Sequence, residues 1–377
     1  MNWKIPLFKI YWEEDDVESV SGVIRSGMNW ATGPKVEEFE RSIAKYTGLE
    51  HAVTFNSGTS ALHGAMLAYG IGPKDEVIVP SFTFIATANA PLFVGAKPVF
   101  ADVEEETFGL DPSDVAEKIT KKTRAIMPIH VGGCPCHIRE IAEIADDRHI
   151  PLIEDAAESL GAKIGERKVG SFGDSAMFSF CGPKVITTGE GGVMVTNRRD
   201  LAEKLKLIRS HGRAETQDYF STNEYLDYVA LGYNWRISNI LAALGVTQMG
   251  KIDRIIGMRR RNAAYMTERL NRLAPGVKTP SPPSSYFHLF QMYTIRTGNR
   301  DALMSHLGKR GIMAKVYFPP VHLTHFYRNV LHDTSSLPVT EKLARDSLTL
   351  PMYPSLSSAE MDFMIGEIGG FFGGARS

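Results

Sequence analysis

The sequence predicts an α/β fold: a large domain with a mostly parallel sheet flanked by helices, followed by a smaller α+β C-terminal domain. Two observations support this prediction. Between residues 36 and 197, short apolar runs alternate with stretches of helical spacing, a pattern typical of parallel sheets covered on both faces. The segment 275–283, PGVKTPSPP, is rich in proline and has the composition of a linker between two units.

The elements of the large domain alternate along the chain. Strands are predicted at 51–56, 76–80, 97–101, 124–129 and 151–154, and helices at 60–69, 83–94 and 138–148. Two later strands, 175–180 and 191–196, are joined by a polar segment, and helices follow at 201–210 and 237–270. Gly245 and Gly250 are candidate breaks in the last helix because glycine weakens helices.

The smaller domain follows the proline-rich segment, with a strand at 290–296 and helices at 301–310 and 359–368. We therefore place the large domain at residues 1–250, and the linking helix with the small C-terminal domain at 251–377. This division leaves the N-terminal segment free to pack with the small domain. A chain of 377 residues with 43% hydrophobic composition is long enough to bury both cores.

Charge and composition exclude several classes of protein. Lys plus Arg (42) nearly balances Asp plus Glu (43), which argues against a nucleic-acid binder. Cys134, Cys136 and Cys181 lack the spacing of a disulfide framework or a zinc site, so we expect free thiols. The N-terminus lacks the apolar run of a signal peptide, and no stretch is long enough to span a membrane. We expect a cytoplasmic protein.

A candidate phosphate site lies at Asn56 to Ser60 (NSGTS), between a predicted strand and a predicted helix. Free N–H groups and the helix dipole favour an anion at a helix start. Gly58 would let the backbone come close, while Thr59 and Ser60 could add hydroxyl donors. Ordinary N-capping is the structural alternative. The segment is not a Walker loop, and the chain carries no dinucleotide fingerprint, so such a phosphate would belong to another cofactor.

A pair of acids, Glu154 and Asp155, comes at the carboxyl end of a predicted strand, where α/β sheets bind ligands. A carboxylate there can cap the next turn, bind a metal or pair with a buried cation. No cluster of ligating residues accompanies the pair, so we predict no metal site. Capping and a functional role both remain open on this observation alone.

Lys184 lies in a glycine-rich and hydroxyl-rich segment between two apolar strands, SFCGPK followed by TTGEGG. A lysine held there would be partly desolvated, which favours the uncharged amine that acts as a nucleophile. A lysine on a surface hairpin is the structural alternative. Together, an amine, an acid and a phosphate site are what pyridoxal phosphate requires, and Phe82 or Phe84 could cover the face of its ring.

The chain resembles a known family over almost its whole length, from about Ile5 to the C-terminal helix. The segments that carry the resemblance are SGTSALHGA from Ser57, VPSFTFIATANA from Val79, EDAAESLGA from Glu154, SFGDSAMFSF from Ser171, KVITTGEGGVMVTN from Lys184 and GYNWRISNILAALG from Gly232. Their order and spacing are similar to those of the DegT/StrS-type nucleotide-sugar aminotransferases, which have the type I aminotransferase fold.

The resemblance implies pyridoxal 5'-phosphate as cofactor, converted to pyridoxamine 5'-phosphate during turnover. Lys184 would hold it as a Schiff base and act as general acid–base, and Asp155 would pair with the pyridine nitrogen. The other cofactor contacts implied are Gly58, Thr59 and Ser179 at the phosphate, Phe84 on the ring, Glu158 near the 3-hydroxyl, and Asn234 from the neighbouring subunit of a homodimer with shared active sites.

Substrate contacts are implied as well. Trp30 and Thr32, in SGMNWATGP, resemble the loop that contacts the nucleotide sugar, and we place Tyr317 and His322 at the substrate. The chain departs from the family before Pro320-Val321-His322, where residues 314–317 (AKVY) replace a Thr-Arg-Pro type of sequence. It also has Pro183 where many members have asparagine and Cys181 where an aromatic is common. The sugar nucleotide therefore stays open.

The function implied is transfer of an amino group, with glutamate as the expected donor, to a keto-sugar nucleotide for surface polysaccharide or a related glycoconjugate. We expect a 4-keto-6-deoxy sugar because EDAAESLGA resembles enzymes that make 4-amino sugars; a 3-keto sugar is the alternative. Relatives that dehydrate sugars have histidine at the lysine position, so Lys184 favours transamination. Two further functions are less favoured. The intact pair of Lys184 and Asp155 argues against a cofactor-binding regulatory protein without turnover, and the whole-chain pattern argues against a lyase or desulfurase acting on amino acids.

Overall fold

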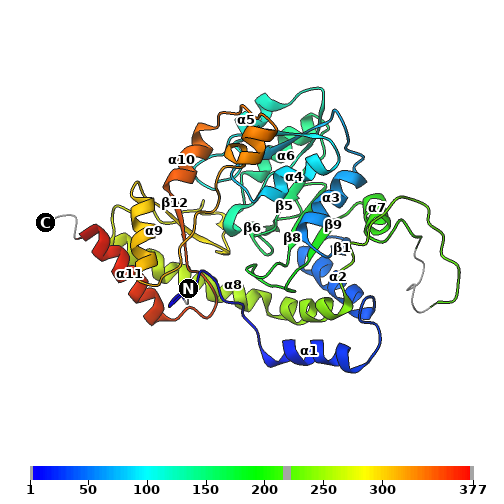
Figure 1. Ribbon diagram of the computed structural model, residues 1–377, viewed down its shortest axis with the longest axis horizontal. Helices are drawn as coiled ribbons and strands as arrows, with labels where there is room; N and C mark the ends of the chain where they lie inside the picture. Colours follow the sequence, from blue (N-terminus) through cyan, green and yellow to red (C-terminus); the bar gives the residue numbers. More distant parts are fainter. Residues whose placement is uncertain (1–2, 215–221, 374–377) are drawn as a thin grey trace.

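The computed structural model describes residues 3–214 and 222–373 (Figure 1). A central β-sheet carries helices on both faces, and a smaller group of elements surrounds the C-terminal half of the long helix α8 (Asn239–Leu273). The α/β fold predicted from the sequence is confirmed. No helix within the described ranges is long and apolar enough to cross a membrane.

The central sheet joins two hydrogen-bonded groups of strands, in the orders β3–β2–β4 and β5–β8–β9–β1. Parallel bridges, Ile126 to Leu152 and Ile129 to Asp155, connect the two groups. The paired strands run parallel, except that β9 is antiparallel to both β8 and β1. Their bounds are β1 (His51–Phe55), β2 (Glu76–Pro80), β3 (Lys97–Ala101), β4 (Thr123–Ile126), β5 (Ile153–Asp155), β8 (Ser175–Ser179) and β9 (Gly192–Thr196).

Helices cover both faces of this sheet because alternate side chains of a strand point to opposite faces. In β9, Met194 packs into a core formed with α3, α4 and α7, whereas Val193 and Val195 pack into a core formed with α2 and α8. The helices outside the smaller unit are α1 (Glu14–Arg25), α2 (Pro34–Thr47), α3 (Gly58–Ala68), α4 (Ile85–Phe93), α5 (Pro112–Lys118), α6 (Ile138–Asp147) and α7 (Arg199–Arg209).

The smaller unit is built on the antiparallel pair β11 (Tyr293–Arg296) and β12 (Ser347–Leu350). Its hydrophobic core includes Ile5 from the N-terminal segment, whose N–H donates to the Gly311 carbonyl at 3.1 Å. The N-terminal segment thus packs with C-terminal elements, while the domain boundary after residue 250 stays a prediction. The remaining elements are β6 (Lys163–Ile164), β7 (Arg167–Lys168), β10 (Tyr286–Phe287), α9 (Arg300–Lys309), α10 (Pro338–Asp346), α11 (Ser358–Gly373) and the short helical turns Val131–Gly133, Val321–Leu323 and Phe326–Val330.

Helix α8 runs without a break through Gly245 and Gly250, so the predicted breaks are wrong. Gly245 serves packing instead: a Cβ atom there would lie 2.6 Å from Cζ of Phe39 in α2. The absence of a side chain lets the two helices approach closely, and this contact outweighs the low helix propensity of glycine. The uninterrupted helix supplies side chains to both hydrophobic cores.

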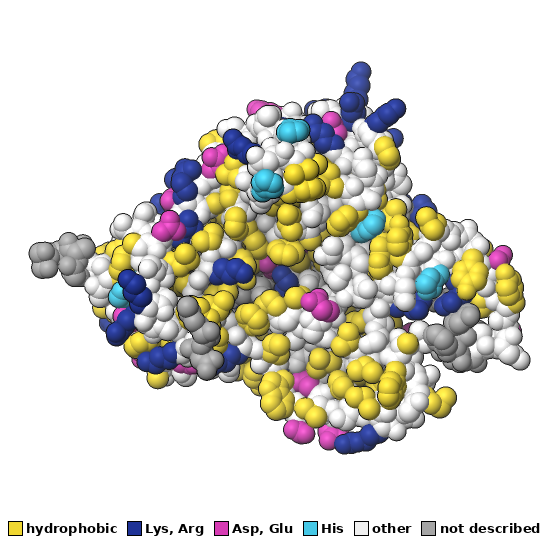
Figure 2. Space-filling model, viewed as in Figure 1, with side chains coloured by type: hydrophobic (Ala, Val, Ile, Leu, Met, Phe, Trp, Pro, Cys, Tyr) yellow, Lys and Arg dark blue, Asp and Glu magenta, His cyan; other side chains and the backbone are white. Residues whose placement is uncertain are grey.

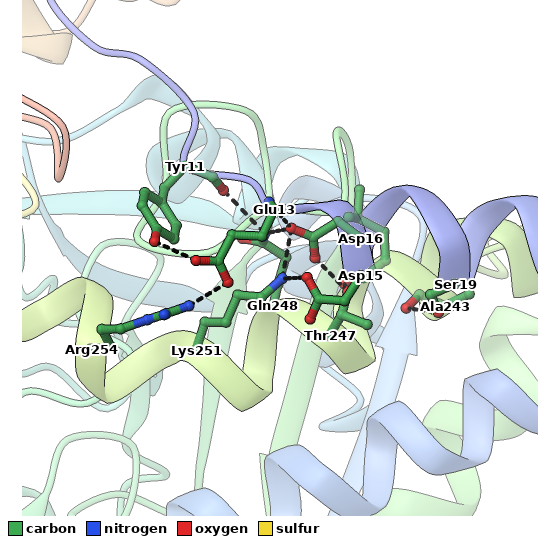
Figure 3. A network of polar contacts seen from close by, with 11 residues as sticks. Tyr11, Glu13, Asp15, Asp16, Ser19, Ala243, Thr247, Gln248, Lys251 and Arg254 are labelled. Atoms are coloured by element: carbon green, nitrogen blue, oxygen red, sulfur yellow. Dashed lines mark hydrogen bonds and ion pairs between the residues drawn. The ribbon is translucent and has the colours of Figure 1, made fainter.

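A polar network fixes α1 against α8 (Figure 3). Asp16 is 3% exposed and accepts a hydrogen bond from Gln248 Nε2 at 3.0 Å, while Lys251 Nζ lies 2.7 Å from the same carboxylate oxygen. Burial raises the pKa of Asp16, but the hydrogen bonds from Lys251, from Thr247 and from the Glu13 N–H outweigh it and place the pKa below its ordinary value. Hydrogen bonds and the ion pair thus offset the cost of burying the Asp16 carboxylate, and they fix the position of α1 on α8.

Candidate active site

Four strands of the sheet end at one edge, and the residues that follow them converge there. The carboxyl ends of β1, β2, β5 and β8 lead into Ser57, Phe84, Glu158 and Lys184. Ligands bind α/β sheets at this edge. A cavity of about 420 Å³ opens there. The predicted site residues that line it are Gly58, Thr59, Phe84, Asp155, Glu158, Ser179, Lys184 and Tyr317.

Asp155 is the last residue of β5 and is 2% exposed. Its carboxylate accepts a hydrogen bond from Thr87 Oγ1 at 2.7 Å and another from the Ala157 N–H at 3.1 Å. Burial raises the pKa of Asp155, and these two hydrogen bonds offset burial only in part. A carboxylate in this state gains from a cationic partner, so a protonated ring nitrogen in the cavity would complete its environment.

The Lys184 amine lies on the cavity wall, 3.3 Å from Oε1 of Glu158. Glu158 is 4% exposed, and its Oε2 accepts a hydrogen bond from the Gly132 N–H at 2.8 Å. The side chain of Lys184 is 17% exposed. The amine is therefore held by one buried carboxylate and still open to the cavity, as a nucleophile or proton carrier must be.

The phosphate site predicted from the sequence lies at the start of α3. Ser57 is the N-cap, and its Oγ accepts a hydrogen bond from the Ser60 N–H at 3.1 Å. The first N–H groups of a helix have no partner within the helix, and here they belong to Gly58 and Thr59, which line the cavity. A Cβ atom on Gly58 would lie 3.0 Å from Sδ of Met177. Capping by Ser57 is confirmed, and binding of a phosphate at the neighbouring N–H groups stays a prediction.

The structure separates the two candidate ring-covering phenylalanines. Phe84 is 59% exposed and lines the cavity, whereas Phe82 is 0% exposed and packs edge-on against Phe108 and Phe318. Only Phe84 of this pair can cover a ring in the cavity.

Glu154 has a structural role, although it precedes Asp155 directly. It is fully buried and accepts hydrogen bonds from the N–H groups of Gly170, Phe172 and Gly173, each at 2.7 Å. His130 Nδ1 accepts from the Cys136 N–H, so its Nε2 carries the proton and donates to Glu154 at 2.9 Å. The two acids of the pair therefore face opposite sides of the strand, as alternation requires.

Four predicted site residues do not line this cavity. Asn234 is exposed and pairs with Ser210, while Trp30, 49% exposed, and Thr32 lie between α1 and α2. His322 is 1% exposed, and its Nδ1 lies 2.7 Å from Ser81 Oγ. Burial lowers the pKa of His322 despite the nearby Glu341. This placement gives no support to a direct substrate contact by His322.

Several lining residues were not singled out from the sequence. Thr87 holds Asp155, and Glu190, Gln291, Lys315 and Leu7 contribute to the wall. Thr87 is three residues beyond Phe84, and Glu190 lies within TTGEGG, so each adjoins a recognised motif. Gln291 and Leu7 come from distant parts of the chain, and no local pattern marks them. Lys315 lies in residues 314–317, the segment where the chain departs from the family.

These residues fit pyridoxal phosphate. The cavity brings together a buried acid without a direct ion pair among the described residues, an amine, an exposed aromatic face and the first N–H groups of a helix. These are the groups that the ring nitrogen, aldehyde, ring face and phosphate of this cofactor need. The fold and this set of side chains define an aminotransferase of the pyridoxal-phosphate-dependent class.

Comparisons with known proteins agree. The profile of the DegT/DnrJ/EryC1/StrS aminotransferase family matches residues 11–368, and the chain belongs to this family. It is 40% identical to GDP-perosamine synthase of Caulobacter vibrioides, covering 89% of each chain. It is 35% identical to UDP-N-acetyl-3-dehydro-alpha-D-glucosamine 3-aminotransferase of Acidithiobacillus ferrooxidans, covering 92% of this chain and 91% of that one. The crystal structure of the aminotransferase TlmJ from Streptoalloteichus hindustanus superimposes with a TM-score of 0.92 at 29% identity, covering 99% of this chain and 100% of that one.

Proposed function

We propose that this protein transfers an amino group from glutamate to a keto-sugar nucleotide, with Lys184 as the cofactor-holding lysine. The observation that carries the proposal is the pairing of Lys184 with Glu158 at 3.3 Å in a cavity that also contains buried Asp155. When bound, pyridoxal phosphate supplies an aldehyde that carries the amino group and a ring that accepts electrons.

The chain's own residues have three tasks in this reaction. Asp155 stabilises positive charge on the ring, because burial leaves its carboxylate in need of a cation. The Lys184 amine moves a proton between carbon atoms, and Glu158 orients that amine through the 3.3 Å contact. Gly58, Thr59 and Ser179 would hold the phosphate, and Phe84 would exclude water from one face of the ring.

The acceptor we propose is a 4-keto-6-deoxy sugar carried by a nucleotide. The similarity to a GDP-perosamine synthase, at 40% identity, favours it. A 3-keto sugar nucleotide is the second candidate, because the chain is also 35% identical to a UDP-sugar 3-aminotransferase. Lys315 lines the cavity. It provides a cation for the phosphates or carboxylates of such substrates.

Spectroscopy tests the reaction first. We expect protein loaded with pyridoxal phosphate to show a visible absorption band, and glutamate to convert this band to that of the pyridoxamine form. Keto-sugar nucleotides with the ketone at C4 should then restore the original band, and those with the ketone at C3 should not. A band that glutamate leaves unchanged would contradict the proposed donor, and restoration only by C3 ketones would contradict the proposed acceptor.

We further propose that the protein acts as a homodimer with shared active sites. Large apolar side chains are exposed on and near α1 and in the segment before Asn234. Figure 2 shows the hydrophobic surface over α1 on the lower face of the molecule. Exposed apolar area of this extent is typical of an interaction surface. The residues are Trp12, Val17, Ile24, Met28, Trp30, Tyr225, Tyr228, Val229 and Leu231. Asn234 is exposed beside them and outside its own chain's cavity.

Mixing two inactive variants tests whether Asn234 acts across the dimer. Lys184→Ala and Asn234→Ala subunits, denatured and refolded together, should form heterodimers in which one site has both residues intact. Random pairing in a two-fold dimer then restores about a quarter of wild-type activity. Each variant refolded alone is the control. If the mixture is no more active than the sum of the two controls, Asn234 does not act in the partner's site.

A further inference from the structure

The wall of the cavity includes Gln291, which lies far from Lys184 in sequence but contacts the turn that precedes this lysine. Gln291 is 8% exposed, and its Nε2 donates a hydrogen bond to the carbonyl of Pro183, the residue before Lys184. A carbonyl can only accept, so this contact fixes which end of the amide faces the lysine turn. The other end, Oε1, is buried with no hydrogen-bond partner among the described residues.

Arg259 of α8 holds the backbone of Gln291 from behind. Its Nη1 donates to the carbonyls of Phe290 at 3.3 Å, Gln291 at 3.2 Å and Met352 at 3.1 Å. The side chain is 2% exposed, and burial lowers its pKa to about 10. No carboxylate forms an ion pair with Arg259 in the described part of the chain. A buried guanidinium is costly unless its environment is ordered around it, which makes this segment a fixed part of the wall.

Gln291 and its neighbour Met292 also belong to the segment that contacts the loop holding Glu158, the carboxylate beside Lys184. The Met292 N–H donates to the Gly132 carbonyl at 3.0 Å, and the Gly132 N–H donates to Glu158 Oε2 at 2.8 Å. Glu158 Oε1 is the atom 3.3 Å from Lys184 Nζ. Residues 291 and 292 therefore touch both supports of the amine, the turn that precedes it and the loop that holds its carboxylate.

We propose that Gln291, held by Arg259, is a positioning residue that fixes the direction of the Lys184 amine through the Pro183 carbonyl. The inference rests on the proposed function, since it concerns the lysine that function requires. Gln291 touches the main chain of the lysine turn and transfers no proton itself. Loss of the Gln291 side chain should change the direction in which the Lys184 amine points, while substrate binding elsewhere in the cavity is kept.

The test compares Gln291→Met with the matched variant Gln248→Met. Gln248 is also buried, at 1% exposed, and its Nε2 also donates to a main-chain carbonyl, that of Tyr11, but at the junction of α1 and α8. Both variants lose one buried glutamine and keep its volume. A purely structural effect would therefore appear in both as a lower melting temperature.

Two readouts report on Lys184. In cofactor-free protein, trinitrobenzenesulfonate should label Lys184 faster in Gln291→Met than in wild type, as followed by mass spectrometry of the Lys184 peptide. In loaded protein, the pH at which the visible band changes should shift. Conversion of the band by glutamate should slow about 3- to 10-fold, the change in rate that corresponds to the free energy of one buried hydrogen bond. The glutamate concentration for half-maximal rate should change little.

Gln248→Met should match wild type in the labelling rate of Lys184 and in the pH at which the visible band changes, because Gln248 does not contact the lysine turn. Equal values for Gln291→Met and wild type in both readouts would overturn the positioning role, as would equal shifts in the two variants. A wild-type protein without a visible band would instead contradict the proposed function, and the labelling rate in cofactor-free protein would still decide the positioning of Lys184.

Discussion

Replacing Lys184 with alanine should lower kcat/KM for transamination by more than the roughly 10²- to 10⁴-fold that loss of a general acid–base group typically costs, because in the proposed function the same amine also holds the cofactor. The reaction is measured by chromatography of the amino-sugar nucleotide formed from glutamate and the acceptor. The visible band of the loaded protein should disappear as well. This is the largest effect we expect from any single side chain.

The variant Lys184→Arg distinguishes the effect of the positive charge at this position from the effect of the reactive amine. Arginine keeps a cation for Glu158, which is 4% exposed and would otherwise be a buried carboxylate without its lysine. We expect the arginine variant to be closer to wild type in melting temperature than the alanine variant, and equally inactive. Lys163→Ala, at an exposed ion pair with Glu166, is the control and should be fully active. Substantial turnover by Lys184→Arg would remove Lys184 from the catalytic role.

The second large effect should come from Asp155→Asn. An asparagine amide can still accept from the Ala157 N–H and can donate to Thr87 Oγ1, so the local structure should survive. It cannot balance a positive charge on the ring. Breaking a buried charge pair costs about 3–5 kcal/mol, so kcat should fall about 10²- to 4 × 10³-fold, since each ~1.4 kcal/mol is tenfold. Steady-state kinetics with saturating cofactor measures this loss.

Stability of the cofactor-free protein provides an independent check on Asp155. Burial raises its pKa in the folded state above the unfolded value, so the folded state binds more protons and stability falls as pH rises through the interval between the two values. Asp155→Asn removes that fall, and urea unfolding at several pH values should reveal it. Asp174→Asn, an exposed carboxylate that accepts the Leu152 N–H, is the control. A pH dependence of stability identical in wild type and Asp155→Asn would refute the role of burial.

Much of the sheet could be predicted because its strands are short apolar runs bounded by turns. The strand predicted at 51–56 is β1 at His51–Phe55, and the strand predicted at 191–196 is β9 at Gly192–Thr196. The location of the site could be predicted from the same pattern, since the carboxyl ends of parallel strands lie at one edge of the sheet. Lys184, Asp155 and the start of α3 accordingly meet in one cavity.

What could not be predicted depends on contacts between distant segments. The sequence did not indicate that Gly245 permits the approach of Phe39, or that Gln291 reaches Pro183, because neither residue belongs to a local motif. Position along the strand alone did not separate Glu154 from Asp155, and only the family resemblance singled out Asp155. Their opposite environments follow from strand alternation together with the loop at Gly170 to Gly173, which only the folded chain brings to Glu154.

The pairing of Ile5 with the C-terminal elements has a consequence for biosynthesis. On the ribosome Ile5 and Leu7 emerge long before Gly311 and Met352, whose main-chain groups they contact. The N-terminal segment therefore stays without these main-chain partners while the region that contains the central sheet can already begin to fold. Closing so long a loop is slow, so we expect completion of the smaller unit's core to be a late step in folding.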